Sequence, residues 1–184
     1  MLMSKLKEAL ICFRAGTVTL PYPFQPADPA PGFRGKVTLD AGKCIGCGAC
    51  ANACPPRVIS LTDDGDERTF FLTMERCTYC ARCQEVCPET AISLSQEFEL
   101  ATNDKHDLTI TFRLRLARCS RCGSRFTTER IVRKLEAEAP NLIGVPAAGL
   151  RWLEMCPDCR MVQESYKMGV EAARGDLVHG VDTR

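Results

Sequence analysis

The sequence has no long apolar run, no large excess of one charge and only two histidines. Because a helix that crosses a bilayer needs about 20 apolar residues, we expect any membrane contact to be peripheral. The 24 lysines and arginines are balanced by 23 acidic residues, which argues against a nucleic-acid partner. There is no dinucleotide-binding fingerprint, flavin motif or nickel-binding pair of cysteine motifs, so we expect no catalytic centre in this chain.

The histidines and arginines give weak signals. His106 and His179 lie in polar stretches, so we expect both to be solvated and neither to bind a metal. One small group of arginines is expected to face an acidic surface of a partner subunit. This group consists of Arg113, Arg115, Arg118, Arg121 and Arg125.

Cysteine is the residue that the sequence has in abundance, with 13 in 184 residues. Eight of them form two runs of Cys-x2-Cys-x2-Cys-x3-Cys-Pro, which is the signature of bacterial two-cluster ferredoxins. In that arrangement three thiolates of a run bind one 4Fe-4S cluster and the fourth binds the other cluster. We therefore predict two clusters, with Cys44, Cys47, Cys50 and Cys87 as ligands of the first and Cys77, Cys80, Cys83 and Cys54 as ligands of the second.

The two runs belong to a duplicated unit, because the similarity continues beyond the cysteines. Each run is followed by the same triplet, Ile59-Ser-Leu61 after the first and Ile92-Ser-Leu94 after the second. The two triplets are 33 residues apart, as are the corresponding cysteines of the two runs. Disulfides are a weaker interpretation, since we expect no secretory signal in Met1–Glu8 and expect the thiols to lie in a reducing cytoplasm. Zinc pairs are weaker too, because they are usually separated by about 15 to 20 residues.

A second cysteine group follows the ferredoxin runs and predicts a separate metal site. Cys-x-x-Cys-Gly and Cys-Pro-x-Cys resemble the two knuckles of a zinc ribbon or rubredoxin-like module. The predicted ligands are Cys119, Cys122, Cys156 and Cys159. We expect zinc, with a single iron as the alternative and redox-active dithiols as a weaker one. A helix over 127–139, capped by Thr127 or Thr128 and ended by Pro140, would fill the interval between the pairs.

The remaining segments predict an α+β fold. Apolar residues at helical spacing predict an amphipathic helix over 2–13, in which Cys12 would be a buried small hydrophobe. Alternating residues predict a hairpin of strands 57–62 and 68–73 and a half-buried strand over 108–116. The domains expected are an N-terminal helix (1–15), a proline-rich extended arm (16–36), a ferredoxin domain (37–101), the four-cysteine module (102–168) and a poorly ordered tail (169–184).

The order of these segments resembles a known family. An amphipathic helix, an arm with Tyr22-Pro and Phe33-Arg-Gly-Lys36, two ferredoxin runs and the segment 95–101 resemble the two-cluster ferredoxin subunit of respiratory complex I. The added four-cysteine module is more similar to the iron-sulfur subunit of formate hydrogenlyase and hydrogenase-4, which are membrane-bound nickel-iron hydrogenases.

This resemblance implies an electron-transfer subunit that relays single electrons to hydrogenase catalytic subunits. The implied partners are the hydrogenase small and large subunits and a four-cluster or dehydrogenase electron donor. The implied location is the cytoplasmic side of the inner membrane, as a peripheral subunit. Two alternatives stay open, a ferredoxin-type subunit of a complex I-like quinone oxidoreductase and a free soluble ferredoxin.

Overall fold

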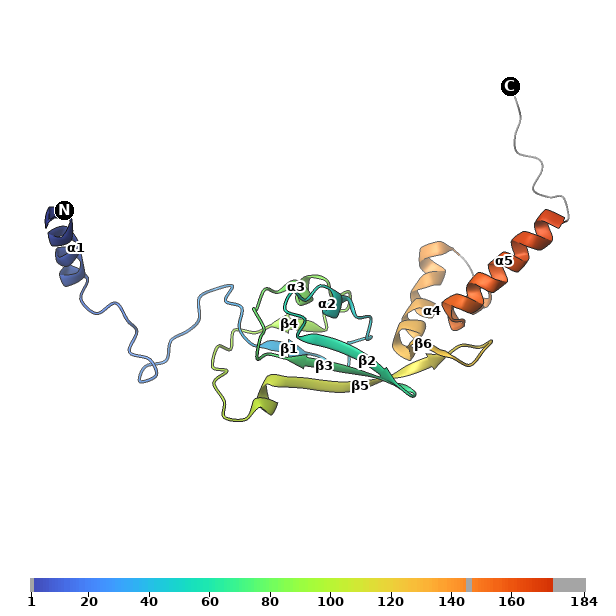
Figure 1. The fold of residues 1–184 in the computed structure, drawn as a ribbon, viewed down its shortest axis with the longest axis horizontal. Coiled ribbons are helices and arrows are strands. Elements are labelled where there is room, and N and C mark those ends of the chain that lie inside the picture. The colour runs from blue at the N-terminus through green and yellow to red at the C-terminus, as the bar shows by residue number, and fades with distance from the viewer. Residues whose placement is uncertain (1, 145–146, 174–184) are drawn as a thin grey trace, which may run out of the picture. The chain divides into compact units, whose positions relative to one another are not determined.

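The computed structural model describes residues 2–144 and 147–173, which divide into two compact units, 1–33 and 34–184. The first unit contains helix α1 (Leu2–Ala15) followed by a segment without regular helix or strand (Figure 1). The helix was predicted, but the prediction of a buried Cys12 is wrong. Cys12 is exposed, as are all side chains described on α1, because nothing within this unit covers them.

The second unit begins with a two-stranded sheet. Strand β1 (Val37–Leu39) pairs antiparallel with β4 (Ile92–Leu94). The pairing extends to the end of the proline-rich segment, since the N–H groups of Gly35 and Lys36 donate to the carbonyls of Ser95 and Glu97. Residues 34–36 therefore join the ferredoxin-like part of the chain.

A four-stranded antiparallel sheet lies beside this pair, in the order β2-β3-β5-β6. Strands β2 (Ile59–Asp64) and β3 (Glu67–Thr73) form the predicted hairpin, with a tighter turn than expected. Strand β5 (Thr109–Arg118) confirms the predicted alternation, with Leu114 and Leu116 buried. It follows a 3₁₀ helix (Lys105–Leu108) and pairs with β3 over seven residues, so the strand that leads to the last four cysteines continues the ferredoxin sheet (Figure 1).

The main core lies between the two sheets and the cysteine runs. Short helices α2 (Ala49–Asn52) and α3 (Arg82–Glu85) carry Cys50 and Cys83. The ring of Phe70 stacks on that of Phe112, with centroids 4.9 Å apart, which fixes β5 against the hairpin. The buried core residues are Val37, Val58, Ile59, Phe70, Leu72, Met74 and Ile92.

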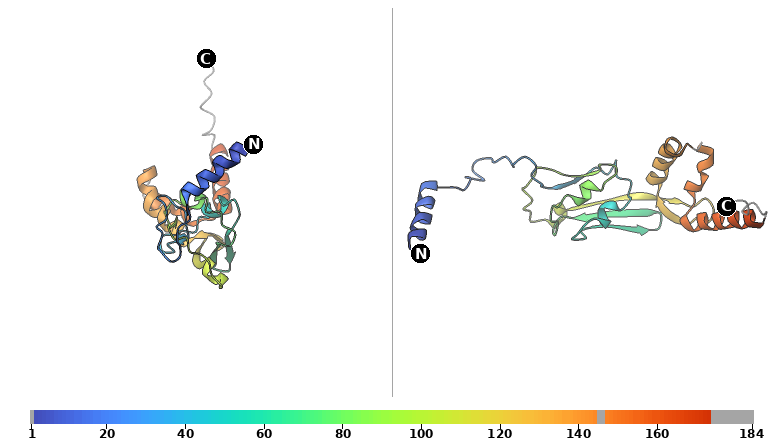
Figure 2. Two further views of the ribbon diagram at one scale, coloured as in Figure 1. Left: turned by 90° about the vertical axis from the view of Figure 1, so that its left-hand side faces the viewer. Right: turned by 90° about the horizontal axis from the view of Figure 1, so that it is seen from above.

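The C-terminal part contains strand β6 (Arg125–Thr128), helix α4 (Glu129–Ile143), a 3₁₀ helix (Ala147–Glu154) and helix α5 (Pro157–Ala173). Figure 2 shows that β6 and α4 follow at the far end of the long strand β5. Thr128 caps α4 by accepting a hydrogen bond from the Ile131 N–H, as one of the two predicted caps.

Two helix ends differ from the sequence prediction. The prediction that Pro140 ends α4 is wrong, because the helix continues to Ile143 and is capped by Gly144 in the left-handed conformation. A proline in the last turn removes only one helical hydrogen bond, and the Gly144 N–H donates to the Pro140 carbonyl. Helix α5 also runs past Gly169 to Ala173, so the expected tail is shorter; its remainder, with His179, lies outside the described residues.

Three arginines of the predicted group form ion pairs with carboxylates of the β2–β3 hairpin. Arg113 pairs with Glu67, and both Arg118 and Arg125 pair with Asp66 in the β2–β3 turn. Hydrogen bonds from Arg125 and Arg118 lower the pKa of Asp66 to about 2. These ion pairs lie at the surface, with 71% of the Arg113 side chain and 65% of the Arg118 side chain exposed, so contact of this group with an acidic partner surface stays a prediction.

In the described part of the chain, no helix combines the length and the apolar character that crossing a bilayer requires.

Candidate iron–sulfur sites and a third cysteine cluster

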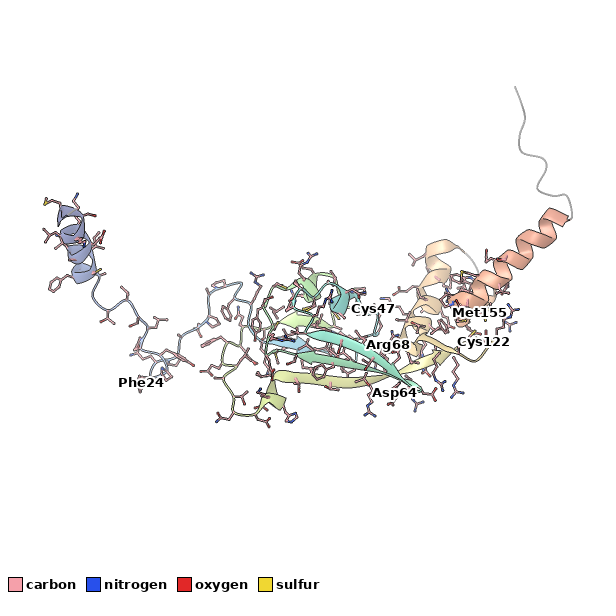
Figure 3. The ribbon with its side chains drawn as sticks, viewed as in Figure 1. Phe24, Cys47, Asp64, Arg68, Cys122 and Met155 are labelled. Atoms are coloured by element: carbon pink, nitrogen blue, oxygen red, sulfur yellow. The ribbon has the colours of Figure 1, made fainter. Side chains whose placement is uncertain are left out.

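Two cavities are each lined by four of the eight cysteines in the ferredoxin runs. The first is lined by Cys44, Cys47 and Cys50, and by Cys87 from the other run. Figure 3 labels Cys47 on the segment that leads into α2. The structure thus brings together the four residues that the spacing groups as the first ligand set, three from one run and one from the other.

The second cavity repeats this arrangement with the runs exchanged. Its cysteines are Cys77, Cys80 and Cys83, together with Cys54 from the first run. Val37, Ile59 and Leu72 of the core lie against this cavity, whereas Phe70 and Ile92 lie against the first. The two cavities therefore share one apolar core, which excludes water from the inner side of both.

The backbone of the two runs repeats as well as the cysteines. Positive φ angles recur at positions 33 residues apart: Gly46 (72°) and Tyr79 (51°), Gly48 (80°) and Ala81 (66°), Arg57 (52°) and Thr90 (47°). Residues other than glycine are uncommon in this conformation and persist where the surroundings impose it. The second run adopts the same backbone conformation without glycine at these positions. The conformation is therefore imposed by the arrangement of the loop around its cavity and not by glycine.

Two thiols in each cavity have raised pKa values. Burial raises the pKa of Cys50 to about 12, and neighbouring thiolates, including Cys83 of the other cavity, add to the rise. Burial also raises the pKa values of Cys44, Cys77 and Cys83. Four thiols that line one cavity can all ionise only if a cationic centre compensates their charge. The donor set therefore fits an iron–sulfur cluster in each cavity.

Backbone N–H groups point at several of these sulfurs. The Tyr79 N–H lies 3.5 Å from the Cys77 sulfur and the Ala91 N–H lies 3.3 Å from the Cys87 sulfur. The Gly46 N–H donates to the Cys44 sulfur. This hydrogen bond lowers the pKa of Cys44 and partly offsets the rise that burial causes. Such N–H groups stabilise negative charge on the sulfurs of a cluster.

Side chains from β3, β6 and α4 contact the first cysteine loop from its outer side. Arg130 Nη1 lies within hydrogen-bond distance of the carbonyls of Ala41, Gly42 and Cys44, at 2.7 Å for Cys44. The fully buried Thr128 hydroxyl donates to the Ile45 carbonyl. Arg68 Nη1 donates to the Gly46 carbonyl at 2.9 Å. No local sequence pattern marks these contacts, because they join positions 22 residues apart for Arg68 and more than 80 residues apart for Thr128 and Arg130.

The last four cysteines come together at the end of β5. The sulfurs of Cys119, Cys122, Cys156 and Cys159 all lie within 4.8 Å of one another. Those of Cys122 and Cys156 are 3.7 Å apart, close to the roughly 3.8 Å expected between thiolates at about 2.3 Å from one tetrahedral ion. The first pair lies in the β5–β6 turn and the second at the beginning of α5. This cluster could hold a metal ion.

The electrostatics of this third cluster are uneven. The N–H groups of Cys122 and Cys156 lower the pKa of Cys119 to about 6, whereas hydrogen bonding with the Cys156 thiol raises the pKa of Cys159 to about 12. One thiolate forms readily and the last does not, which is the behaviour of a donor set that needs a cation. Nearby, the Arg160 guanidinium lies 5.3 Å from the Trp152 ring and 5.8 Å from the Phe126 ring, which joins α5 to β6.

Two adjacent cavities with four cysteines each, connected by a duplicated backbone, define an iron–sulfur electron-transfer protein of the dicluster ferredoxin class. Residues 43–92 match the family of 4Fe-4S dicluster domains. The chain is also 38% identical to formate hydrogenlyase subunit 6 of Escherichia coli over 150 residues, which cover 80% of this chain and 83% of that protein. The chain belongs to the family of this subunit.

Two further relatives match shorter parts of the chain. NADH-quinone oxidoreductase subunit I of Carboxydothermus hydrogenoformans is 44% identical over 54 residues, covering 28% of this chain and 39% of that protein. F(420)H(2) dehydrogenase subunit I of Methanosarcina mazei is 41% identical over 61 residues, covering 33% and 34%. These matches span a third or less of this chain, whereas the match to the hydrogenlyase subunit spans most of it.

Proposed function

We propose that this chain relays single electrons through two 4Fe-4S clusters to the catalytic subunits of a membrane-bound nickel-iron hydrogenase of the formate hydrogenlyase type. The proposed ligands are Cys44, Cys47, Cys50 and Cys87 for the first cluster and Cys77, Cys80, Cys83 and Cys54 for the second. A 4Fe-4S cluster accepts and releases one electron at a time. The chain's own residues hold the two sites side by side and keep water from their inner faces.

The observation that carries this proposal is the pair of four-cysteine cavities with their fourth cysteines exchanged. The exchange ties each site to both halves of the duplicated unit. The influence of Cys83 on the pKa of Cys50 supports a short separation between the sites. Adjacent one-electron centres in a chain with no catalytic motif are suited to relaying electrons.

The proposed partners are hydrogenase small and large subunits and a four-cluster or dehydrogenase donor, with the chain peripheral on the cytoplasmic side of the inner membrane. Similarity to formate hydrogenlyase subunit 6 over 80% of the chain supports this choice. A subunit of a complex I-like quinone oxidoreductase is the second candidate, favoured by the match to NADH-quinone oxidoreductase subunit I over 54 residues. A free soluble ferredoxin explains neither the N-terminal helix nor the last four cysteines.

The third cysteine cluster is proposed to hold one zinc ion, with one iron as the alternative, in a zinc-ribbon or rubredoxin-like site. Four thiolates in a closed tetrahedral set are typical of structural zinc. In this role Cys119, Cys122, Cys156 and Cys159 join the β5–β6 turn to α5 and stabilise the C-terminal part. Metal analysis of the purified chain distinguishes the two ions.

Single cysteine variants test the ligand assignment. Cys47→Ala should remove about half of roughly eight cluster irons, and Cys80→Ala should remove the other half, because each residue belongs to a different site. Iron analysis and electron paramagnetic resonance (EPR) of the dithionite-reduced chain measure both effects. Cys12→Ala is the control and should leave both signals unchanged, since Cys12 lies in the other unit. Two intact clusters in Cys47→Ala would show that the assignment is wrong.

Anaerobic affinity purification of the tagged chain tests the partners. Copurification of nickel and hydrogenase subunits is the expected result, and a formate dehydrogenase among them would identify the donor. Flavin and nicotinamide-oxidising subunits without nickel would instead favour the complex I-like candidate. A chain purified alone with both clusters would favour the free ferredoxin.

A further inference from the structure

The outer side of the first cysteine loop is held by side chains at successive peptide groups. The carbonyls of Cys44, Ile45 and Gly46 accept hydrogen bonds from Arg130, Thr128 and Arg68, in that order. Each donor comes from a different element, respectively α4, the end of β6, and β3. Three consecutive carbonyls are therefore directed away from the first cavity.

This orientation determines where the N–H groups of the loop point. In a trans peptide the carbonyl and the following N–H point in opposite directions. With their carbonyls turned outward, the peptides after Cys44, Ile45 and Gly46 present their N–H groups to the opposite side. That side carries the first cavity, which Cys44, Gly46 and Cys47 line. The donors on the outer side therefore hold the loop in the conformation that stabilises negative charge inside it.

The second cysteine loop has no comparable cover. In the described residues, the one side chain bound to a carbonyl of its Cys77–Cys80 turn is the exposed Arg34, whose Nη1 donates to Cys80 at 3.3 Å. The position that corresponds to Gly46 is Tyr79, which carries its own half-buried side chain. A side chain at Gly46 would collide with Leu114 and Thr128, so the C-terminal extension takes that place over the first loop.

Each loop has an arginine without an ion pair among the described residues, but Arg34 beside the second loop is exposed, so solvent screens its charge. Arg130 is half-buried, and within residues 2–144 and 147–173 no carboxylate forms an ion pair with it. Arg68, by contrast, is neutralised by Asp63 at 2.6 Å. An unopposed guanidinium on the first loop favours the state with more negative charge in the cavity beside it, and partial burial limits screening by solvent.

We propose that Arg130 is a positioning residue that couples the four-cysteine module to the first cluster site and raises the reduction potential there above that of the second site. It acts in two ways, by binding the outer carbonyls of the loop and by placing a positive charge next to it. Net charge and hydrogen bonding around the sulfurs are among the properties that set such potentials. This inference rests on the proposed function, since it concerns the order in which the two sites accept electrons.

The test is an EPR-monitored redox titration of the full-length chain, prepared anaerobically with its clusters. In Arg130→Gln the midpoint potential of the first site should shift to a more negative value while that of the second site stays unchanged. Arg133→Gln is the matched control, because it removes the same charge from α4 at an exposed side chain that pairs with Glu129. The Cys47→Ala and Cys80→Ala spectra assign each signal to its site.

Each outcome is decisive for Arg130. Equal shifts in Arg130→Gln and Arg133→Gln, equal shifts at both sites, or no shift would overturn the proposal. Should Arg130→Gln lose the first cluster, Arg130→Lys decides: recovery of that cluster at the wild-type potential supports the proposal, and continued loss reduces Arg130 to a folding role. Absence of two cluster signals from the wild-type chain would instead contradict the proposed function.

Discussion

At Gly46 the backbone has a φ angle of 72°, and a Cβ atom there would lie 2.5 Å from Leu114 Cδ1 and 2.9 Å from Thr128 Cγ2. Gly48, two residues later, has a φ angle of 80° but open space around it. The same left-handed backbone thus occurs twice, once against packed side chains and once without them. This pair of glycines separates the effect of backbone strain from the effect of packing.

We expect Gly46→Ala to destabilise the first site more than Gly48→Ala does. Both variants carry a strain of about 1 to 2 kcal/mol for a Cβ in the left-handed region. Only Gly46→Ala adds an overpacking cost of about 1 to 3 kcal/mol, because Leu114 and Thr128 must move. The temperature at which cluster absorbance is lost measures the difference. Equal midpoints in the two variants would show that the C-terminal extension does not press on this loop.

Sequence reasoning at the residue scale is informative where the chemistry is local, although the ligand assignment itself stays a prediction. The ferredoxin spacing predicted which cysteines share a cavity, because the distances between ligands along the chain reflect the geometry of the loop. It could not identify Arg130, since arginine in the first turn of a helix is usually solvated. Its role depends on a tertiary contact with the segment 41–44.

At the scale of elements, the junction of β6 and α4 joins the two cysteine regions. Thr128 is fully buried, and its hydroxyl caps α4 at Ile131 while donating to the Ile45 carbonyl in the first loop. One hydroxyl therefore serves both a helix and a loop from a distant part of the chain. Its removal should affect both regions together.

Thr128→Val keeps the shape of the side chain and removes its hydroxyl. We expect a loss of about 1 to 2 kcal/mol from the helix cap and about 1 to 3 kcal/mol from the unpaired Ile45 carbonyl. Thr128→Ser is the control, since it keeps the hydroxyl and loses only a buried methyl group, which costs about 1 kcal/mol. Thermal unfolding monitored by circular dichroism and by cluster absorbance should rank valine below serine. The reverse order would mean that the methyl contact matters more than the two hydrogen bonds.

The sequence predicted the strands and helices that have a clear hydrophobic period. It did not predict which strands pair with one another. Alternation in 108–116 predicted β5, but nothing local indicated that β5 pairs with β3 and extends the ferredoxin sheet. Pro140 was wrongly predicted to end α4. A proline in the last turn disrupts a single hydrogen bond, and Gly144 provides the actual cap.

At the scale of the whole molecule, the two units differ in how much apolar surface each buries by itself. The core, both cysteine cavities and the four-cysteine cluster use residues from 37 onward. The first unit has apolar side chains that are largely exposed, including Leu6 at 58%, Phe13 at 88% and Phe24 at 92%. Since a short helix is marginal in water, these side chains are suited to cover by another subunit.

Removal of residues 1–33 should therefore leave the iron–sulfur sites intact and abolish assembly. We expect the remaining chain to retain both EPR signals and its iron content, because every cysteine of those sites and the β1–β4 pairing are preserved. Copurification with partner subunits should fall to background. Full-length chain with Leu6, Leu10 and Phe13 changed to serine is the matched control, and it should fail to assemble in the same way if the apolar surface of α1 is what binds. Normal assembly of that triple variant would assign docking to the proline-rich segment, and loss of the clusters on truncation would show that the first unit supports the fold of the second.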